Sequence, residues 1–134
     1  MLINLWLTPK DNQLSFDLPS IIFKPKQEVC VTSLFIKWKN NVNNPAITLT
    51  SSLIDKSICN PTRQLAFVYK KGNSKYLSFT PTHKKYYKIQ CLDLKSSFIK
   101  LIDLETDKNV ENIQFIYLQL EVIDGIQQNI KATQ

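Results

Sequence analysis

A chain of 134 residues is most simply one domain, and at this size it can bury a core without disulfide or metal support. Only two glycines are present, so we expect long polar connections rather than many tight hairpin turns. The formal net charge is +6, carried almost entirely by lysine, with Arg63 as the sole arginine. Because proteins that read nucleic acid favour arginine for bidentate contacts, this composition indicates at most a weak attraction to polyanions.

The cysteines and the absence of targeting signals suggest an intracellular location. Cys30, Cys59 and Cys91 match no metal-binding or redox spacing. Cys30 and Cys91 lie in apolar runs and are predicted core residues, whereas Cys59 lies in a polar loop as a free thiol. No secretory leader or run of membrane-spanning length is visible, and the Asn-Pro-Thr sequence at 60–62 contains the proline that prevents glycosylation. We therefore expect no membrane contact and a reducing compartment, the nucleus or the cytoplasm.

The N-terminal part of the chain has the alternation of β-strands. Apolar residues alternate over 3–7 and again over 14–18, and each run is followed by a proline. The segment 28–39 is longer, and its apolar residues change parity near Thr32. A strand that changes its buried face in this way either contains a bulge or is covered on both sides.

The middle of the chain continues the pattern. Residues 47–54 predict a strand whose threonines face outward, and residues 65–70 predict another. The Lys-Gly-Asn-Ser sequence at 71–74 is a hairpin signal that leads into 76–79, and residues 87–91 alternate again. Residues 94–104 fit both a helical face and a strand. We interpret them as a strand because the segment is short, contains β-branched residues and lies between strands.

Residues 113–123 form the clearest strand of the sequence. Four aliphatic side chains point one way and four larger or polar ones the other: Ile116, Leu118, Leu120 and Val122 against Phe115, Tyr117, Gln119 and Glu121. We predict that this is a central strand. Counting the patterns gives about eight to ten short strands, so residues 1–125 are predicted to form one all-β domain and residues 126–134 a polar tail.

No constellation of residues predicts catalysis, a cofactor or a metal. His83 is the only histidine and lies in a polar turn, and no nucleophile motif accompanies it. Asp103, Glu105 and Asp107 form an acidic cluster that lacks the spacing of an EF-hand and its glycine, so we interpret it as a solvated turn. The alternative for His83 is a pair with a cysteine that is distant in sequence and close in space. The alternative for the acidic cluster is a calcium site. We predict that the protein is not an enzyme.

A basic stretch with interleaved aromatic residues is a candidate polyanion contact, formed by Lys84, Lys85, Tyr86 and Lys88 around Tyr87. Such a patch can stack on single-stranded nucleic acid and neutralise it. The alternative is that the aromatic rings belong to the core and the lysines to a wet strand edge. Trp6 and Trp38 are predicted to fill a core or an interface, because tryptophan buries a large area.

Several of these stretches together resemble the small single jelly-roll proteins of Polinton (Maverick) elements and adintoviruses, the penton-type minor capsid proteins. Residues 14–23 resemble their opening strands, and residues 27–38 resemble the strand that often reads W-E-V-A-L-x-E-I. Residues 87–91, 99–103, 106–109 and 115–122 resemble their closing series, in which a strand ends in Asp, a polar turn follows and the last strand reads like V-x-L-x-I. This sequence departs from those proteins in three respects. It has Lys26-Gln27 in place of the tryptophan of their W-E-V motif, it lacks the glycine of their closing turn, and it is shorter than a penton protein.

The resemblance implies a single jelly-roll β-sandwich of about eight antiparallel strands in two sheets. It implies a structural virion protein that forms a homo-oligomer, a trimer or a pentamer, or assembles with other capsid subunits. Exposed apolar side chains would then make the interface, and Trp6, Phe115 and Tyr117 are the candidates. The alternative is a non-enzymatic β-sandwich binding module that recognises carbohydrate, protein or nucleic acid.

Overall fold

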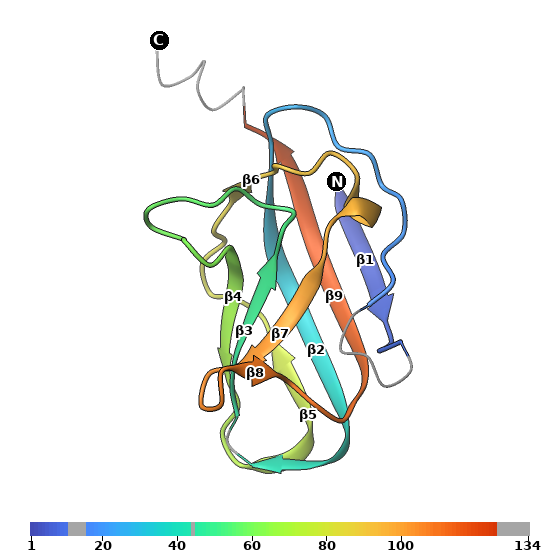
Figure 1. The fold of residues 1–134 in the computed structure, drawn as a ribbon, viewed down its shortest axis with the longest axis vertical. Helices are drawn as coiled ribbons and strands as arrows, with labels where there is room; N and C mark the ends of the chain where they lie inside the picture. Colours follow the sequence, from blue (N-terminus) through green and yellow to red (C-terminus); the bar gives the residue numbers. More distant parts are fainter. Residues whose placement is uncertain (11–15, 44, 126–134) are drawn as a thin grey trace.

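The computed structural model describes residues 1–10, 16–43 and 45–125, and within them the chain is all-β. Two antiparallel sheets face each other as a sandwich, with β3 and β7 crossing in front of β2 and β9 in the view of Figure 1. The one helical element described is the 3-10 turn η1 (Leu94–Ser96), so no helix in this part of the chain is long enough to cross a membrane. The predicted all-β class is confirmed, while the predicted tail at 126–134 lies outside the described residues.

The larger sheet has five strands in the order β1-β9-β2-β5, with β6 also paired to β2. Their bounds are β1 (Leu2–Leu7), β2 (Gln27–Asn43), β5 (Asn73–Phe79), β6 (Tyr87–Lys88) and β9 (Ile113–Asp124). Strand β9 pairs with β1 on one side and with β2 on the other. The prediction that residues 113–123 form a central strand is therefore confirmed.

The smaller sheet has the order β4-β3-β7-β8, with β3 (Ala46–Ser51), β4 (Gln64–Tyr69), β7 (Ile99–Asp103) and β8 (Lys108–Asn109). Ile47 and Leu49 point into the core, so the threonines of β3 lie on its outer face, as predicted, yet Thr48 and Thr50 are buried there. Strand β3 has neighbours on both sides, and Thr48 lies between the larger Phe67 and Ile102 in the register. A small side chain flanked in this way is covered even on the outer face of a sheet.

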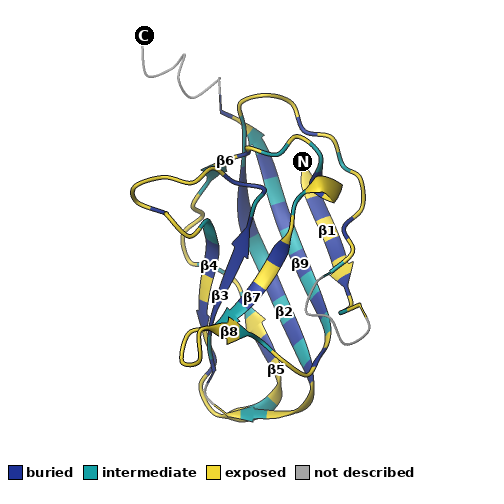
Figure 2. Ribbon diagram, viewed as in Figure 1, coloured by how far each residue is buried: buried dark blue, intermediate teal, exposed yellow. Residues whose placement is uncertain are grey.

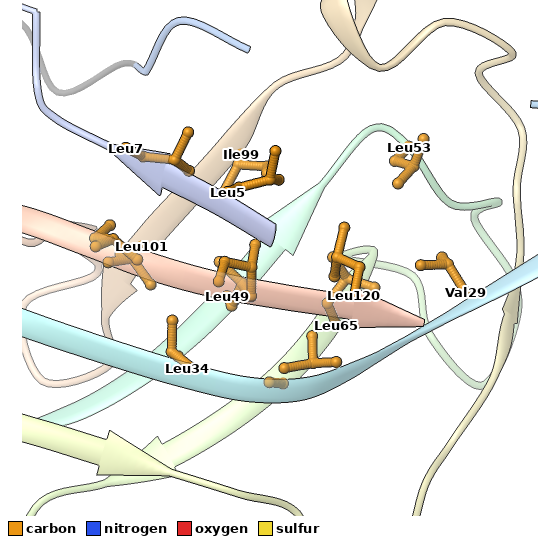
Figure 3. Close-up of a cluster of buried hydrophobic side chains, with 14 of the residues drawn as sticks. Leu5, Leu7, Val29, Leu34, Leu49, Leu53, Leu65, Ile99, Leu101 and Leu120 are labelled. Carbon is orange, nitrogen blue, oxygen red and sulfur yellow. The ribbon is translucent and has the colours of Figure 1, made fainter. Parts of the chain in front are cut away.

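The core lies between the two sheets and is almost entirely aliphatic. Alternate residues of β9 point into it, so Ile116, Leu118, Leu120 and Val122 are buried, as their spacing predicts. Figure 2 shows this alternation along β9, where buried and half-buried residues follow one another. In Figure 3, Leu34 and Leu120 of the larger sheet approach Leu49 and Leu101 of the smaller one. Each such side chain contributes roughly 1.5–3 kcal/mol by leaving water.

A β-bulge in β2 explains the change of parity in the sequence. Val31 pairs with Leu120 and Ser33 with Gln119, so Thr32 is the extra residue of the bulge. Its hydroxyl donates to the side-chain oxygen of Gln119 at 2.9 Å, which holds the bulge against β9. The bulge lets residues before and after it face the same core, because one inserted residue shifts the alternation by one position. Of the two explanations predicted for the change of parity, a bulge or coverage on both sides, the structure shows the bulge.

The strand pairs are nested in the sequence. The two strands nearest the middle of the chain pair with each other, and each further pair joins one segment before them to one segment after them. The innermost pair is β3 with β4, followed by β2 with β5 and β6. Next, residues 21–23 meet 92–94, where the N–H of Phe23 bonds the Leu92 carbonyl at 2.7 Å and the N–H of Leu94 bonds the Ile21 carbonyl at 2.9 Å. The outermost pair is β1 with β9. The resulting ribbon is folded over, which brings β9 beside β2 and β7 beside β3.

Two of the strand predictions need correction. The sequence at 71–74 does not close a hairpin, because β4 and β5 lie in different sheets and the segment crosses between them. Gly72 has a φ of +93°, a backbone conformation that favours glycine. Lys70 is buried, and its ammonium donates to the carbonyls of Val42 and Gly72 at 3.1 and 2.7 Å. Of the strand predicted at 14–18, only residues 16–18 are described, and they form no strand beyond an isolated bridge between Phe16 and Pro9.

The ambiguous segment 94–104 contains a turn and a strand. The Asp93 carboxylate accepts a hydrogen bond from the N–H of Lys95 at 3.1 Å and so begins the 3-10 turn η1. Strand β7 follows at Ile99 and pairs with β3. The strand interpretation is thus confirmed for the second half of the segment and was wrong for the first, where a capping aspartate favours a turn.

Candidate interaction surface

Five aromatic side chains cover one end of the outer face of the larger sheet. We name them the aromatic face: Trp6 of β1, Phe35 of β2, Tyr76 of β5, and Phe115 and Tyr117 of β9. The register brings them together, because Tyr117 lies between Trp6 and Phe35 in one row. In the next row, Lys37 lies between Phe115 and Tyr76. The three predicted interface residues are therefore neighbours, contributed by two adjacent strands.

The rings form a continuous chain across the sheet. Trp6 lies 4.7 Å from Tyr117 and 5.8 Å from Phe115, measured between ring centroids. Phe35 lies 5.8 Å from Phe115 and 6.0 Å from Tyr76, and all four pairs are tilted. Tilted rings at these separations attract one another beyond the area that they bury. The surface is therefore ordered rather than a set of independent side chains.

Both ends of the aromatic face remain open to solvent. Trp6 is 70% exposed and Tyr76 is 51% exposed. Trp6 is therefore a surface residue, whereas Trp38 is the tryptophan of the core, at 1% exposure. Scattered surface hydrophobic residues are ordinary in soluble proteins, but a contiguous exposed patch marks an interaction site.

A row of polar side chains borders the aromatic face. The Asn4 side-chain oxygen accepts hydrogen bonds from the Tyr117 hydroxyl at 2.7 Å and from the Gln119 amide at 2.9 Å. The bulge residue Thr32 bonds the other end of the Gln119 side chain. These bonds fix the orientation of the Tyr117 ring, so the aromatic face is positioned before anything binds to it.

The opposite end of the same sheet face is covered by the chain itself. The Tyr86 hydroxyl donates to Glu121 Oε1, and the Lys84 ammonium lies 3.3 Å from the same carboxylate. Beneath them, Cys30 is buried although its side chain points to the outer face. Residues 84–86 therefore close this end, while the aromatic face stays open.

This cluster shifts the pKa values of its members. The hydrogen bond from Tyr86, with help from Lys84, holds the pKa of Glu121 below its ordinary value. The same bond raises the pKa of the Tyr86 phenol, because the neighbouring carboxylate accepts its proton in the hydrogen bond. Burial raises the pKa of the Cys30 thiol above its ordinary value.

The predicted polyanion contact is divided by this arrangement. Lys84 and Tyr86 turn towards Glu121, so a carboxylate lies inside the basic stretch. Lys85 lies 5.5 Å from the centre of the Tyr87 ring, and Lys88 stands opposite Glu28 in the register. Partial neutralisation by carboxylates leaves no uniform basic groove in this stretch.

The remaining candidate residues lie apart from the aromatic face. His83 is exposed, and the free cysteines are buried at Cys30, half-buried at Cys91 and exposed at Cys59. The Asp103 carboxylate accepts from the N–H of Glu105 at 2.9 Å, so it stabilises the turn before β8. Among the described residues, no group of three or more His, Cys, Asp or Glu is placed to hold a metal ion.

A pocket of about 290 Å³ opens at one end of the sandwich, with Asp103 in its wall. The rest of its wall includes Trp38, Lys108 and Glu111, so charges of both signs line a pocket of mixed polarity. No catalytic pair follows from this lining.

Two members of the aromatic face, Phe35 and Tyr76, are missing from the prediction made from the sequence. Their alternation with buried neighbours was visible, since Phe35 lies between Leu34 and Ile36. Which other strand they would meet was not, because strand pairing is decided by contacts distant in sequence. The chain matches no protein-family model, and no curated protein or solved structure was found to be similar to it.

Proposed function

We propose that the protein is a non-enzymatic single jelly-roll subunit of a virus-like shell, which self-associates or assembles with other shell proteins. The observation that carries this proposal is the aromatic face, which is ordered and open at Trp6 and Tyr76. Apolar surface of this kind is buried when subunits assemble, and aromatic side chains dominate the energetics of such contacts.

The nested strand pairs support the jelly-roll part of the proposal. A jelly roll is a sandwich built from two Greek keys, in which the last strand returns beside the first. Here β9 returns between β1 and β2, and β7 returns beside β3. A jelly roll has one more strand between β1 and β2 in the sequence, which belongs to the smaller sheet. Residues 21–23, which pair with 92–94 just before β7, occupy that place. Strands β6 and β8 are short additions to this plan.

The proposed partners are further copies of the chain, as a trimer or pentamer, and other capsid subunits, with the assembled protein in the virion. Closed shells need contacts around symmetry axes, and the connections at the ends of a sandwich supply them. The connections at 55–62 and 71–74 are exposed over most of their length. The aromatic face adds an apolar contact to these polar ones.

A comparison of two exposed hydrophobic residues tests the proposal. Trp6→Ala removes the most exposed ring of the aromatic face, whereas Ile58→Ala removes an even more accessible side chain from a loop, since Ile58 is 100% exposed. Sedimentation velocity should show at least tenfold weaker association for Trp6→Ala and no change for Ile58→Ala. Equal association of Trp6→Ala and the wild type would remove the aromatic face from the proposal.

A second candidate function is recognition of a ligand by the same face, as a β-sandwich binding module for carbohydrate, protein or nucleic acid. The observation in its favour is that the rings adjoin the side-chain amides of Asn4 and Gln119, while the Lys37 ammonium lies 5.6 Å from the Tyr76 ring. Bases stack on such rings, and binding to nucleic acid weakens steeply as salt rises. Saturable binding of a sugar or an oligonucleotide by a protein that stays monomeric would favour this candidate.

A further inference from the structure

Strand β1 forms an edge of the larger sheet and lacks the features that usually protect such an edge. Among the described strands it pairs with β9 alone. Its sequence, Leu2–Leu7, contains no charge, no proline and no glycine, and its register with β9 has no bulge. An apolar, regular edge strand is a template for pairing with another chain.

The other edges differ from β1 in this respect. Strand β5 contains the exposed Lys75, and its register with β2 is interrupted after Lys37. Strand β4 has an irregularity opposite Thr50, and β8 has only two residues. Charges, bulges and short length are the devices by which sheets avoid pairing at an edge. Among the described strands, β1 is therefore the edge at which the larger sheet can be extended.

The backbone groups available on this edge follow from the pairing with β9. Met1 and Val122 exchange two hydrogen bonds, at 3.0 and 2.8 Å. In an antiparallel ladder such pairs alternate, so Ile3, Leu5 and Leu7 also direct their N–H and C=O groups to β9. The N–H and C=O groups of Leu2, Asn4 and Trp6 point away from β9, towards the free edge of the sheet. Residues 21–23, in the connection that follows β1, take their partners from 92–94 instead.

We propose that β1 pairs antiparallel with β1 of a second copy, about a two-fold axis at Asn4. This inference rests on the self-association proposed above and names its surface. The outward groups of Leu2 then bond those of Trp6 in the second copy, Asn4 bonds Asn4, and Trp6 bonds Leu2. The two larger sheets become one continuous sheet with both aromatic faces on the same side.

The side chains of this pairing are self-complementary. Leu2 is 56% exposed and Trp6 is 70% exposed in one copy, and the proposed register places each beside the other across the interface. Aromatic and aliphatic residues directly opposite each other on a sheet stabilise the pair. The two Asn4 amides meet at the axis, so no like charges are opposed. The strand-end connections stay free for the contacts of a larger shell.

A disulfide test locates the axis directly. Asn4→Cys is placed in a Cys59→Ser background, since Cys59 is the exposed native thiol. Directly opposed residues of such a pair have Cα atoms about 5.5 Å apart, within the range that a disulfide spans. Oxidised glutathione should convert most of this variant to a covalent dimer at concentrations where the wild type associates. The control Ser78→Cys, exposed on β5 of the same sheet, should remain mostly uncrosslinked.

Amide hydrogen exchange of the wild type provides a readout that needs no substitution. Exchange at Leu2, Asn4 and Trp6 should slow as protein concentration rises, because association covers these N–H groups. Asn4→Lys places two positive charges at the axis and should weaken association at least tenfold, whereas Ser78→Lys should not. The wild type could associate while the exchange rates of these amides and the yield of the Asn4→Cys crosslink do not change with concentration. In that case the edge pairing is wrong and self-association uses another surface. If the wild type stays monomeric throughout, both this inference and the proposed self-association are overturned.

Discussion

The two tryptophans of the chain have opposite roles at the residue scale. Trp38 points into the core from β2, directly after the last shift of register with β9, and is almost completely buried. Trp6 lies on the outer face of an edge strand, beside the rings of Phe115 and Tyr117. Composition gives both residues the same large apolar area. The face of the strand on which each one lies decides whether that area stabilises the monomer or an assembly.

This difference gives a paired prediction. Trp38→Ala should lower the free energy of unfolding by about 3–5 kcal/mol, because it leaves a cavity between the sheets. Trp6→Ala should change it by no more than about 1 kcal/mol, because the side chain is already in solvent. Urea unfolding at low protein concentration, where association does not contribute, measures both values. A larger loss for Trp6→Ala than for Trp38→Ala would contradict the assignment of the core.

The cluster of Tyr86, Glu121 and Lys84 predicts a pH dependence of stability. Because the pKa of Glu121 is lowered in the folded protein, its contribution is present above the ordinary value of 4.5 and is lost as pH falls through the folded value. Because the pKa of Tyr86 is raised, its contribution is present below the ordinary value of 10.0 and is lost as pH rises through the folded value. The stability difference between the wild type and Tyr86→Phe should thus be largest between about pH 5 and 10.

Urea unfolding of both proteins at pH 3, 7 and above 10 measures this profile. Tyr87→Phe, which deletes the same hydroxyl group from the next residue, is the matched control and should show a flat difference over that range. A difference for Tyr86→Phe that does not narrow at acid pH would mean that its bond to Glu121 contributes nothing to the folded state.

At the scale of elements, the bulge in β2 determines which residues enter the core. Before Thr32 the inward residues are Val29 and Val31, and after it they are Leu34, Ile36 and Trp38. Without the extra residue, one of these two sets would point to solvent for the whole length of its half of the strand. The number of residues at this point matters more than the chemistry of the side chain.

Deleting Thr32 should therefore abolish cooperative folding, whereas Thr32→Ala should cost only about 0.5–1.5 kcal/mol for the lost hydrogen bond. Near-ultraviolet circular dichroism and thermal unfolding distinguish the two outcomes. Native-like unfolding of the deletion variant would show that the strand can slip past the bulge, against the register described here.

The same elements show how far the sequence could be interpreted. Features with a local period were predictable from the spacing of apolar residues. The two faces of β9, the alternation of β1 and the change of parity in β2 are examples. Features decided by distant pairing were not predictable: the burial of Thr48 depends on its neighbours in β4 and β7, and 71–74 was wrongly expected to close a hairpin. The candidate site follows the same division. Trp6, Phe115 and Tyr117 could be suspected one by one, but their contact, and the addition of Phe35 and Tyr76, depend on a register that no single strand contains.

At the scale of the whole molecule, charge and apolar surface oppose each other. The net charge of +6 makes copies repel, while the aromatic face and the β1 edge attract them. Salt screens the repulsion and leaves apolar contact intact. Association of copies should therefore strengthen as salt rises from 50 to 500 mM, as measured by sedimentation equilibrium. Binding of a polyanion would change in the opposite direction, so the sign of the salt effect separates the two proposed functions.

The measurement that tests the central claim most directly is the absolute mass of the wild-type protein in solution. Light scattering behind a sizing column, over a wide range of concentration and at low and high salt, gives this mass without assuming a shape. We predict discrete species above the monomer mass of 15.5 kDa, beginning with dimers and extending to trimers, pentamers or closed particles as concentration rises. A mass of one chain under every condition would contradict self-association and favour the binding module.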